Sequence, residues 1–200
     1  MSPFGRNLYL SLFWRYDMEM AALSGLSLAA GVAVAECLDA LGISGLSLKW
    51  PNDLHWQGRK LAGLLLEVNG EQGGPAQVVL GLGLNLHMEE EHGRMIDQPW
   101  IALSAIPGAP SLGRNRIAGE IVAALTEAMR LYQREGLAPF LSRWERYDGY
   151  LGQPVVLQAG ERRISGIHRG VDSRGALLLE VDATVSAHFG GEVSLRKAGG

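Results

Sequence analysis

Cysteine is almost missing from this chain, and so are several other signals that identify protein classes. A single cysteine, Cys37, among 200 residues excludes an internal disulfide framework and a zinc site built from several cysteines. No uninterrupted apolar run reaches the roughly 18 residues of a membrane-spanning helix. The first residues also lack the basic and apolar regions of a signal peptide. We therefore expect a cytoplasmic protein that does not cross a membrane.

Positive charge is not in excess either. The sequence has 18 Lys and Arg residues against 21 Asp and Glu residues, a net charge of −3, so the whole-chain basic character of a nucleic-acid-binding protein is absent. No GxGxxG leads into a helix and no GxxxxGK[ST] occurs, which excludes a Rossmann fingerprint and a P-loop. The chain is 47% hydrophobic and has 27 glycines, which is typical of a globular protein with many tight turns.

The hydrophobic pattern predicts an α+β domain in the first three quarters of the chain. Strands are expected at 7–14, 46–50, 53–56, 60–68 and 76–86, with a hairpin turn at Gln57-Gly58. Because 61–66 and 76–86 are almost wholly apolar, both are predicted to be covered on both faces. Helices are expected from Ser24, as N-cap, to about Leu41, and at 115–136 and 139–150.

The texture changes after Gly152, where short strands follow one another at close spacing. They are separated by turn signals such as Ala159-Gly160 and Gly190-Gly191. This pattern predicts a small all-β barrel. The predicted domains are residues 1–151 and 152–200. Between the strands and the later helices, 87–110 has no periodicity, which is typical of a functional loop.

The densest group of chemically useful residues is Lys49-Trp50-Pro51-Asn52-Asp53. Pro51 restricts its own backbone and that of Trp50, so the neighbouring side chains are held in place. Lys49 is suited to neutralising a phosphate, and Asp53 to holding Mg²⁺ or a ribose hydroxyl. The alternative is an ordinary strand end whose charges are solvated.

Two further patterns lie on the next strands. Lys60 stands at the start of an apolar strand, where its ammonium suits a carboxylate or a phosphate; an exposed strand start is the alternative. In Gly81-Leu82-Gly83-Leu84-Asn85 the paired glycines suggest that a ligand or another backbone approaches closely, although packing alone also explains them. Asn85 is placed to read a base or a ribose. The five histidines show no metal-ligand spacing.

Taken together, these motifs closely resemble the biotin protein ligases, which join biotin to carboxylase carrier domains. The resemblance rests on KWPND, RKLAGLLLE and GLGLN, with SPFGRNLYLSLFW and GLSLAAGVAVAE before them and GLAPFLSRWERYD, RGVDSRGALLLE and GGEVSLR after them. It covers essentially the whole chain. It implies an α+β fold, with a mixed sheet and packed helices like those of class II synthetases, followed by a small SH3-like barrel. The implied reaction forms biotinyl-5′-adenylate from biotin and Mg-ATP, then transfers biotin to a lysine.

The resemblance also assigns the residues. Lys60 matches the lysine that contacts the biotin carboxylate and the adenylate phosphate; Lys49 and Asp53 match the phosphate and Mg²⁺ side, supported by Asn52. Asn85 lines the nucleotide side. The loop 87–100 matches the segment that closes over the adenylate, with Trp100 packing on adenine, and Arg196 resembles the arginine that reaches toward the nucleotide.

The chain departs from the family at its start. The family's GRGR-type loop, which covers biotin, precedes the Ser2-Pro3-Phe4-Gly5 stretch, and neither that loop nor an N-terminal helix-turn-helix is present. We therefore expect a truncated ligase that does not bind DNA. The main alternative is a non-catalytic fragment that dimerises or binds a partner such as the carrier domain. A lipoate-type ligase is a weaker alternative. A homodimer formed through the strand 64–68 is a further expectation.

Overall fold

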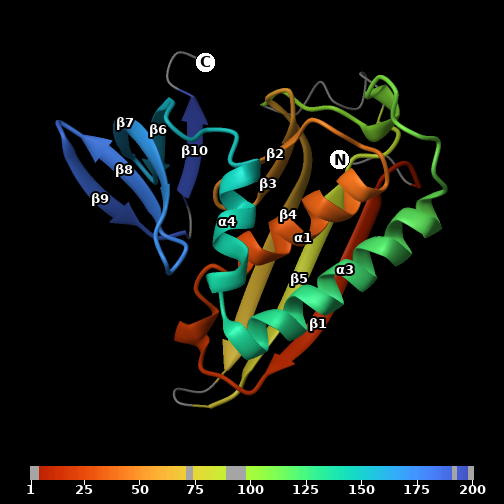
Figure 1. The fold of residues 1–200 in the computed structure, drawn as a ribbon, viewed down its shortest axis with the longest axis horizontal. Helices are drawn as coiled ribbons and strands as arrows, with labels where there is room; N and C mark the ends of the chain where they lie inside the picture. Colours follow the sequence, from red (N-terminus) through yellow and green to blue (C-terminus); the bar gives the residue numbers. More distant parts are fainter. Residues whose placement is uncertain (1–4, 71–73, 89–97, 191–192, 198–200) are drawn as a thin grey trace.

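The computed structural model describes residues 5–70, 74–88, 98–190 and 193–197, and within them two five-stranded sheets (Figure 1). The first sheet has the order β1-β5-β4-β3-β2, and every pairing between its neighbouring strands is antiparallel. Its strands are β1 (Leu8–Tyr16), β2 (Leu46–Lys49), β3 (Asp53–Trp56), β4 (Arg59–Gly70) and β5 (Ala76–Leu84). Parallel pairing occurs at two isolated bridges, Leu48 with Asp148 and Lys60 with Trp100.

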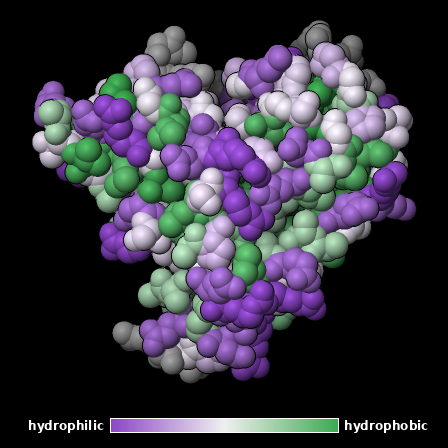
Figure 2. All heavy atoms as spheres, viewed as in Figure 1, coloured by the Kyte–Doolittle hydropathy of each residue, from purple (hydrophilic) through white to green (hydrophobic). Residues whose placement is uncertain are grey.

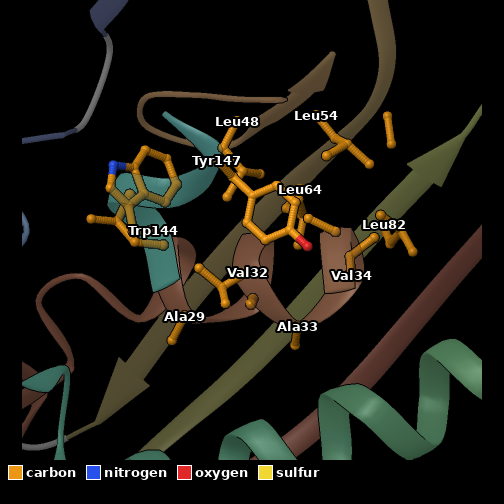
Figure 3. Close-up of a cluster of buried hydrophobic side chains, with 14 of the residues drawn as sticks. Ala29, Val32, Ala33, Val34, Leu48, Leu54, Leu64, Leu82, Trp144 and Tyr147 are labelled. Atoms are coloured by element: carbon orange, nitrogen blue, oxygen red, sulfur yellow. The ribbon is translucent and has the colours of Figure 1, made fainter. Parts of the chain in front are cut away.

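The helices cover one face of this sheet. They are η1 (Met20–Leu23), α1 (Leu26–Ala40), η2 (Leu103–Ala105), α3 (Arg114–Glu135) and α4 (Ala138–Tyr147). In Figure 1, α1, α3 and α4 lie together in front of the strands. Figure 3 shows side chains of α1 and α4 meeting those of β2, β3, β4 and β5 in one apolar core, where Val32, Val34 and Leu54 are fully buried. The core therefore lies between the helices and one side of the sheet.

The start of α1 differs from the prediction. Ser24 is not its N-cap: Gly25, in the left-handed region at φ +84°, occupies that position without a side-chain cap. The Ser24 hydroxyl instead donates 2.8 Å to the carbonyl of Arg174 in the C-terminal domain. A Cβ on Gly25 would lie 2.5 Å from a side-chain atom of Leu137, so close packing as well as backbone geometry requires glycine there. The predicted stop at Gly42 agrees with its φ of +88°.

The predicted burial of 61–66 on both faces is wrong. Leu64 is 2% exposed beneath the helices, whereas Leu65, on the opposite face, is 61% exposed. The outward residues of β5 are likewise only partly buried. Tyr9 and Phe13 of β1 extend the open face, since each is at least 60% exposed. The sheet is thus covered by helices on one side and leaves an apolar surface on the other, among the described residues.

One segment qualifies by length and composition as a membrane span, although no single apolar run does. It comprises Met20–Ala40, and 61% of its most apolar window is buried inside the fold. Most of it is α1, which is the central helix of the core. Its apolar character is accounted for by burial on almost every side.

The second sheet forms the C-terminal β domain, with the order β10-β6-β7-β8-β9. Its strands are β6 (Pro154–Ala159), β7 (Arg162–Val171), β8 (Leu177–Val181), β9 (Thr184–His188) and β10 (Val193–Lys197). In Figure 1 this domain stands beside α4, with β10 nearest the first sheet. The space-filling view shows hydrophilic and apolar residues mixed over both domains (Figure 2). A buried hydrogen bond joins them: the indole N–H of Trp50 donates 3.1 Å to the carbonyl of Gly175.

The one-sided core predicts opposite outcomes for two neighbouring leucines of β4. Leu64→Ala removes buried methyl groups and should lower the free energy of unfolding by about 2–5 kcal/mol. Leu65→Ala makes the same chemical change on the open face and should stay within about 0.5 kcal/mol of the parent. Urea denaturation of both variants measures the difference. Equal losses would mean that the open face is covered by part of the fold.

Candidate active site

Two lysines converge on one carboxylate at the edge where β2, β3 and β4 meet. The Lys60 ammonium lies 2.6 Å from Oδ1 of Asp53, and the Lys49 ammonium lies 3.4 Å from Oδ2. Lys49 and Asp53 are 9% and 8% exposed, whereas the Lys60 side chain remains 28% exposed. The three residues that sequence analysis assigned to catalysis therefore form one cluster.

The local backbone explains how these three side chains meet. Lys49 and Asp53 are paired across the β2–β3 ladder, and Asp53 is paired with Gly63 across the β3–β4 ladder. The turn at Gln57-Gly58 has positive φ at both residues, as the predicted hairpin requires. A Cβ on Gly63 would lie 3.1 Å from the Lys60 ammonium and 3.3 Å from Asp53 Oδ1. The missing side chain of Gly63 therefore leaves the space in which Lys60 reaches Asp53.

Burial and charge act in opposite directions on the protonation of this cluster. Burial alone would raise the pKa of Asp53, but His55, Lys60 and Lys49 outweigh it and hold that pKa at about 2. Nε2 of His55 is 3.9 Å from Asp53 Oδ2, beyond hydrogen-bond distance, so we attribute most of the lowering to Lys60 in direct contact. Burial lowers the pKa of Lys49, while Asp53 opposes that change. Asp53 is thus an ionised carboxylate placed between the side chains of Lys49 and Lys60.

His55 and Tyr150 adjoin the cluster and were not assigned to it from the sequence. His55 is 4% exposed, and its ring lies edge-on to that of Tyr150 with centroids 6.4 Å apart. His55 follows Asp53 by two residues on one strand, so the alternation of side chains was a signal that both face the same side. Tyr150 gave no such signal, because it comes from the segment between the domains.

The side-chain amides of Asn52 and Asn85 donate hydrogen bonds to backbone carbonyl groups. The Asn52 amide donates 2.6 Å to the carbonyl of Leu64, at the point where β4 extends beyond β3. The Asn85 amide donates 3.4 Å to the carbonyl of Lys60 and 3.2 Å to that of Ile101. Asn85 therefore ties the end of β5 to the start of β4, next to Lys60.

Trp100 and Arg196 approach the cluster from two later parts of the chain. Trp100 is bridged to Lys60: the Lys60 N–H donates to the carbonyl of Pro99, and the Ile101 N–H donates to that of Lys60, both at 2.9 Å. Arg196, on β10, is exposed and close enough for its charge to lower the pKa of Lys49. The central part of the predicted closing loop, 89–97, lies outside the described residues.

Beside Lys60 the open face of the sheet is unusually flat. Gly63 of β4 is paired with Gly83 of β5, which is paired with Tyr9 of β1, and Gly81 is paired with Leu65. A Cβ on Gly83 would touch the ring of Tyr9 at 3.4 Å, and one on Gly81 would lie 3.7 Å from the backbone of Leu65. We call Gly63, Gly81 and Gly83 the glycine strip. The strip is half-buried: Lys60 lies above Gly63 and the Tyr9 ring lies against Gly83, with Leu65 as the other apolar border.

Among the described residues, no magnesium site built from three or more protein ligands is present. In the described part of the chain no three His, Cys, Asp or Glu residues are grouped as metal ligands. Asp53 is the single carboxylate of the cluster, and both its oxygens face lysine ammonium groups. This arrangement does not favour Asp53 as a direct ligand, and magnesium commonly relies on substrate phosphates.

Comparisons with known proteins agree with this arrangement of two domains. The family model described as "Biotin/lipoate A/B protein ligase family" matches residues 1–85, and that described as "Biotin protein ligase C terminal domain" matches residues 150–196. The bifunctional ligase/repressor BirA of Escherichia coli is 47% identical over 98% of this chain. This chain spans 61% of that relative's length. The biotin--[acetyl-CoA-carboxylase] ligase of Paracoccus denitrificans is 32% identical over 80% of this chain and 72% of that protein.

Solved structures give the same answer. The apo biotin protein ligase of Aquifex aeolicus superposes with a TM-score of 0.83 at 27% identity, over 96% of this chain and 83% of that one. Its complex with biotin and ATP gives a TM-score of 0.80 at 26% identity, over 96% and 79%. The fold is thus that of a two-domain protein ligase of the biotin/lipoate type. Within that class, the chain belongs to the biotin protein ligase family.

The cluster predicts an acid-dependent contribution to stability. Because the pKa of Asp53 is lowered to about 2, its ionised form stabilises the fold above pH 4. That contribution, about 2 kcal/mol, is lost as the pH falls from 4 toward 2. Asp53→Asn should therefore lower the free energy of unfolding at pH 7 by at least this amount. The difference in stability between parent and variant should be smaller at pH 2. Urea titrations at both pH values measure it.

Asp182→Asn is the matched control, since Asp182 is exposed in the turn between β8 and β9. It should change stability little at either pH. A gap between parent and Asp53→Asn that is the same at pH 7 and pH 2 would contradict the assignment.

Proposed function

We propose that this chain carries the machinery for ATP-dependent attachment of biotin to a lysine of a biotin carboxyl carrier protein, through biotinyl-5′-AMP. The observation that carries the proposal is the convergence of Lys49 and Lys60 on Asp53, beside the glycine strip on the open face. Concentrated positive charge next to a flat apolar surface fits a substrate with a carboxylate at one end and a compact apolar body. Biotin has both.

The first step joins biotin to the nucleotide. A biotin carboxylate oxygen attacks the α-phosphorus of ATP, a P–O bond forms, and pyrophosphate leaves. Negative charge accumulates on the phosphoryl oxygens in the transition state, where Lys60 and Lys49 offset it. Lys60 is the more exposed of the two ammonium groups and is held 2.6 Å from Asp53, so we assign it the contact with the carboxylate and the phosphate. Arg196 approaches Lys49 from β10, on the proposed nucleotide side.

The second step transfers biotin to the carrier. The neutral amine of the carrier lysine attacks the carbonyl carbon of the mixed anhydride, AMP leaves, and the amine loses a proton. Water competes for the same carbonyl, so the site must exclude it. Trp100 is bridged to Lys60 and half-buried, and we assign it the cover of the adenylate base. Asn85 fixes that part of the loop through its contact with Ile101.

A second candidate function is binding of a partner without catalysis, and one observation supports it. Beyond its contact with Asn52, β4 continues from Leu65 to Gly70 with no neighbouring strand on the β3 side, among the described residues. Val68, on this segment, is 37% exposed. An unpaired strand with apolar residues is a template for strand addition. A second copy of the chain or a carrier domain would complete the sheet there.

Lys60→Ala tests the catalytic proposal directly. Without the ammonium group, the charge on the transferring phosphoryl is no longer offset, and adenylate formation should fall about 100-fold or more. A carrier domain is incubated with biotin, Mg-ATP and the chain, and its intact mass shows whether biotin is attached. The release of pyrophosphate gives the rate of adenylate formation. Arg163→Ala removes a positive charge from the exposed end of β7 and is the control.

Three outcomes are informative. Transfer by the parent with loss in Lys60→Ala supports the ligase proposal. Equal rates in parent and variant refute the role of Lys60. No transfer by this chain, with transfer by an N-terminally extended form, would favour the non-catalytic alternative for the chain as it stands.

The open part of β4 predicts self-association that depends on its backbone. Backbone groups alternate in direction along a strand, so the N–H of Leu66 faces the same side as that of Leu64, which donates to the Asn52 carbonyl. Leu66→Pro removes this donor and should leave the protein monomeric, whereas Leu66→Ala keeps it and should still dimerise. Sedimentation velocity of the three proteins tests this. A parent that stays monomeric, or a proline variant that still dimerises, would contradict it.

A further inference from the structure

The segment between the two domains holds a buried pair that takes no direct part in the lysine cluster. The carboxylate Oδ2 of Asp148, just after α4, lies 2.6 Å from Nε2 of His168 on β7, and the two side chains are 1% and 0% exposed. A carboxylate can only accept a hydrogen bond, so the imidazole N–H of His168 donates to Asp148. Nδ1 of His168 has no hydrogen-bond partner in the described part of the chain. Asp148 is therefore the one polar contact that fixes this ring there.

Asp148 begins a stretch that is bonded to β2. It is bridged in parallel to Leu48, and the next residue, Gly149, donates its N–H 3.0 Å to the Leu48 carbonyl. A Cβ on Gly149 would lie 2.9 Å from the side chain of Ser47, so the two backbones are in close contact. Leu48 immediately precedes Lys49. The position of 148–150 therefore sets the position of the strand that carries Lys49.

The same stretch also contacts β3. Tyr150 donates its backbone N–H 3.0 Å to Oδ1 of Asp148, and its ring lies edge-on to His55 at 6.4 Å. Tyr150 is 7% exposed, and its pKa is raised by burial and then by the charge of Asp53. Residues 148–150 thus touch both strands of the cluster, one beside Lys49 and the other beside Asp53.

We propose that His168 is a positioning residue for the adenylation reaction. It acts through Asp148: by holding this carboxylate inside the protein, it keeps 148–150 against β2 and β3 and so fixes the separation of Lys49 and Asp53. The predicted effect on adenylation rests on the proposed function, whereas the predicted effect on the positions of Lys49 and Asp53 does not. Without the imidazole, Asp148 would be a buried charge with no side-chain donor, and its segment would move toward water. Displacement of a charged group by about an ångström strongly affects a reaction that depends on placement.

The test compares three variants of the full chain. His168→Leu removes the donor and keeps an apolar side chain. His168→Gln carries an amide N–H at about the position of Nε2 and restores the donor. Leu157→Ala damages the buried core of the C-terminal β domain, on β6, without touching Asp148. All are measured below the lowest of their melting temperatures. Hydrogen exchange reports on 46–56 and 148–150, and pyrophosphate release gives kcat and the KM for ATP.

His168→Leu should accelerate exchange in 46–56 and 148–150 and lower kcat/KM for ATP about tenfold or more. His168→Gln should restore most of the slow exchange and most of the kcat/KM of the parent. Leu157→Ala should change neither quantity. Equal effects in Leu157→Ala, or unchanged exchange in His168→Leu, would overturn the proposal.

Two further results remain decisive. If the parent forms no adenylate, the proposed function fails, and the exchange data alone decide whether His168 holds the cluster. If His168→Leu does not melt cooperatively, His168→Asn replaces it, because its shorter amide withdraws the donor from Asp148 and leaves the carboxylate charged. Faster exchange in 46–56 of that variant would support the proposal, and unchanged exchange would overturn it.

Discussion

Two ammonium groups held close together in a poorly hydrated place repel each other, and the carboxylate of Asp53 is what makes their proximity possible. Its contacts with Lys60 and Lys49 oppose both that repulsion and the effect of burial on Lys49. The rest of the site accommodates this one group. Gly63 leaves space above it, and the pairing of β3 with both β2 and β4 brings the lysines to it from either side. A charge pattern suited to a phosphate and a carboxylate is thereby present before any ligand binds.

The strands that carry this cluster are poorly suited to hold it by themselves. β2 and β3 have four residues each and lie at one edge of the sheet, where few ladder hydrogen bonds fix them. Their additional contacts come from the C-terminal β domain and the segment before it. Trp50 bonds to Gly175, and Asp148 connects His168 to the backbone beside Leu48. The C-terminal β domain is thus part of the scaffold of the cluster.

Local chemistry was enough to predict much of this fold, and distant contacts account for what was missed. The Gln57-Gly58 hairpin and the stop of α1 at Gly42 follow from residues that tolerate positive φ, a property of the local sequence. Lys49 and Asp53 were found because they are four residues apart around a proline. Ser24 looked like a helix cap but bonds to the carbonyl of Arg174, 150 residues away. Neither Tyr150 near His55 nor His168 on Asp148 is visible in any short window, since both contacts join residues far apart in the sequence, and the second also joins the two domains.

The wrong prediction for β4 and the candidate site have the same origin. An apolar run such as 61–66 normally indicates a strand covered on both faces, because exposed apolar surface is unfavourable in water. Here helices cover only one face, and Leu65 and Tyr9 remain exposed beside the glycine strip. The sequence predicts that the second face of the sheet is also covered, but none of the described residues covers it. A ligand with an apolar body would bury these side chains when it bound. The apolar run 61–66 would then be explained by a ligand that covers the second face of the sheet.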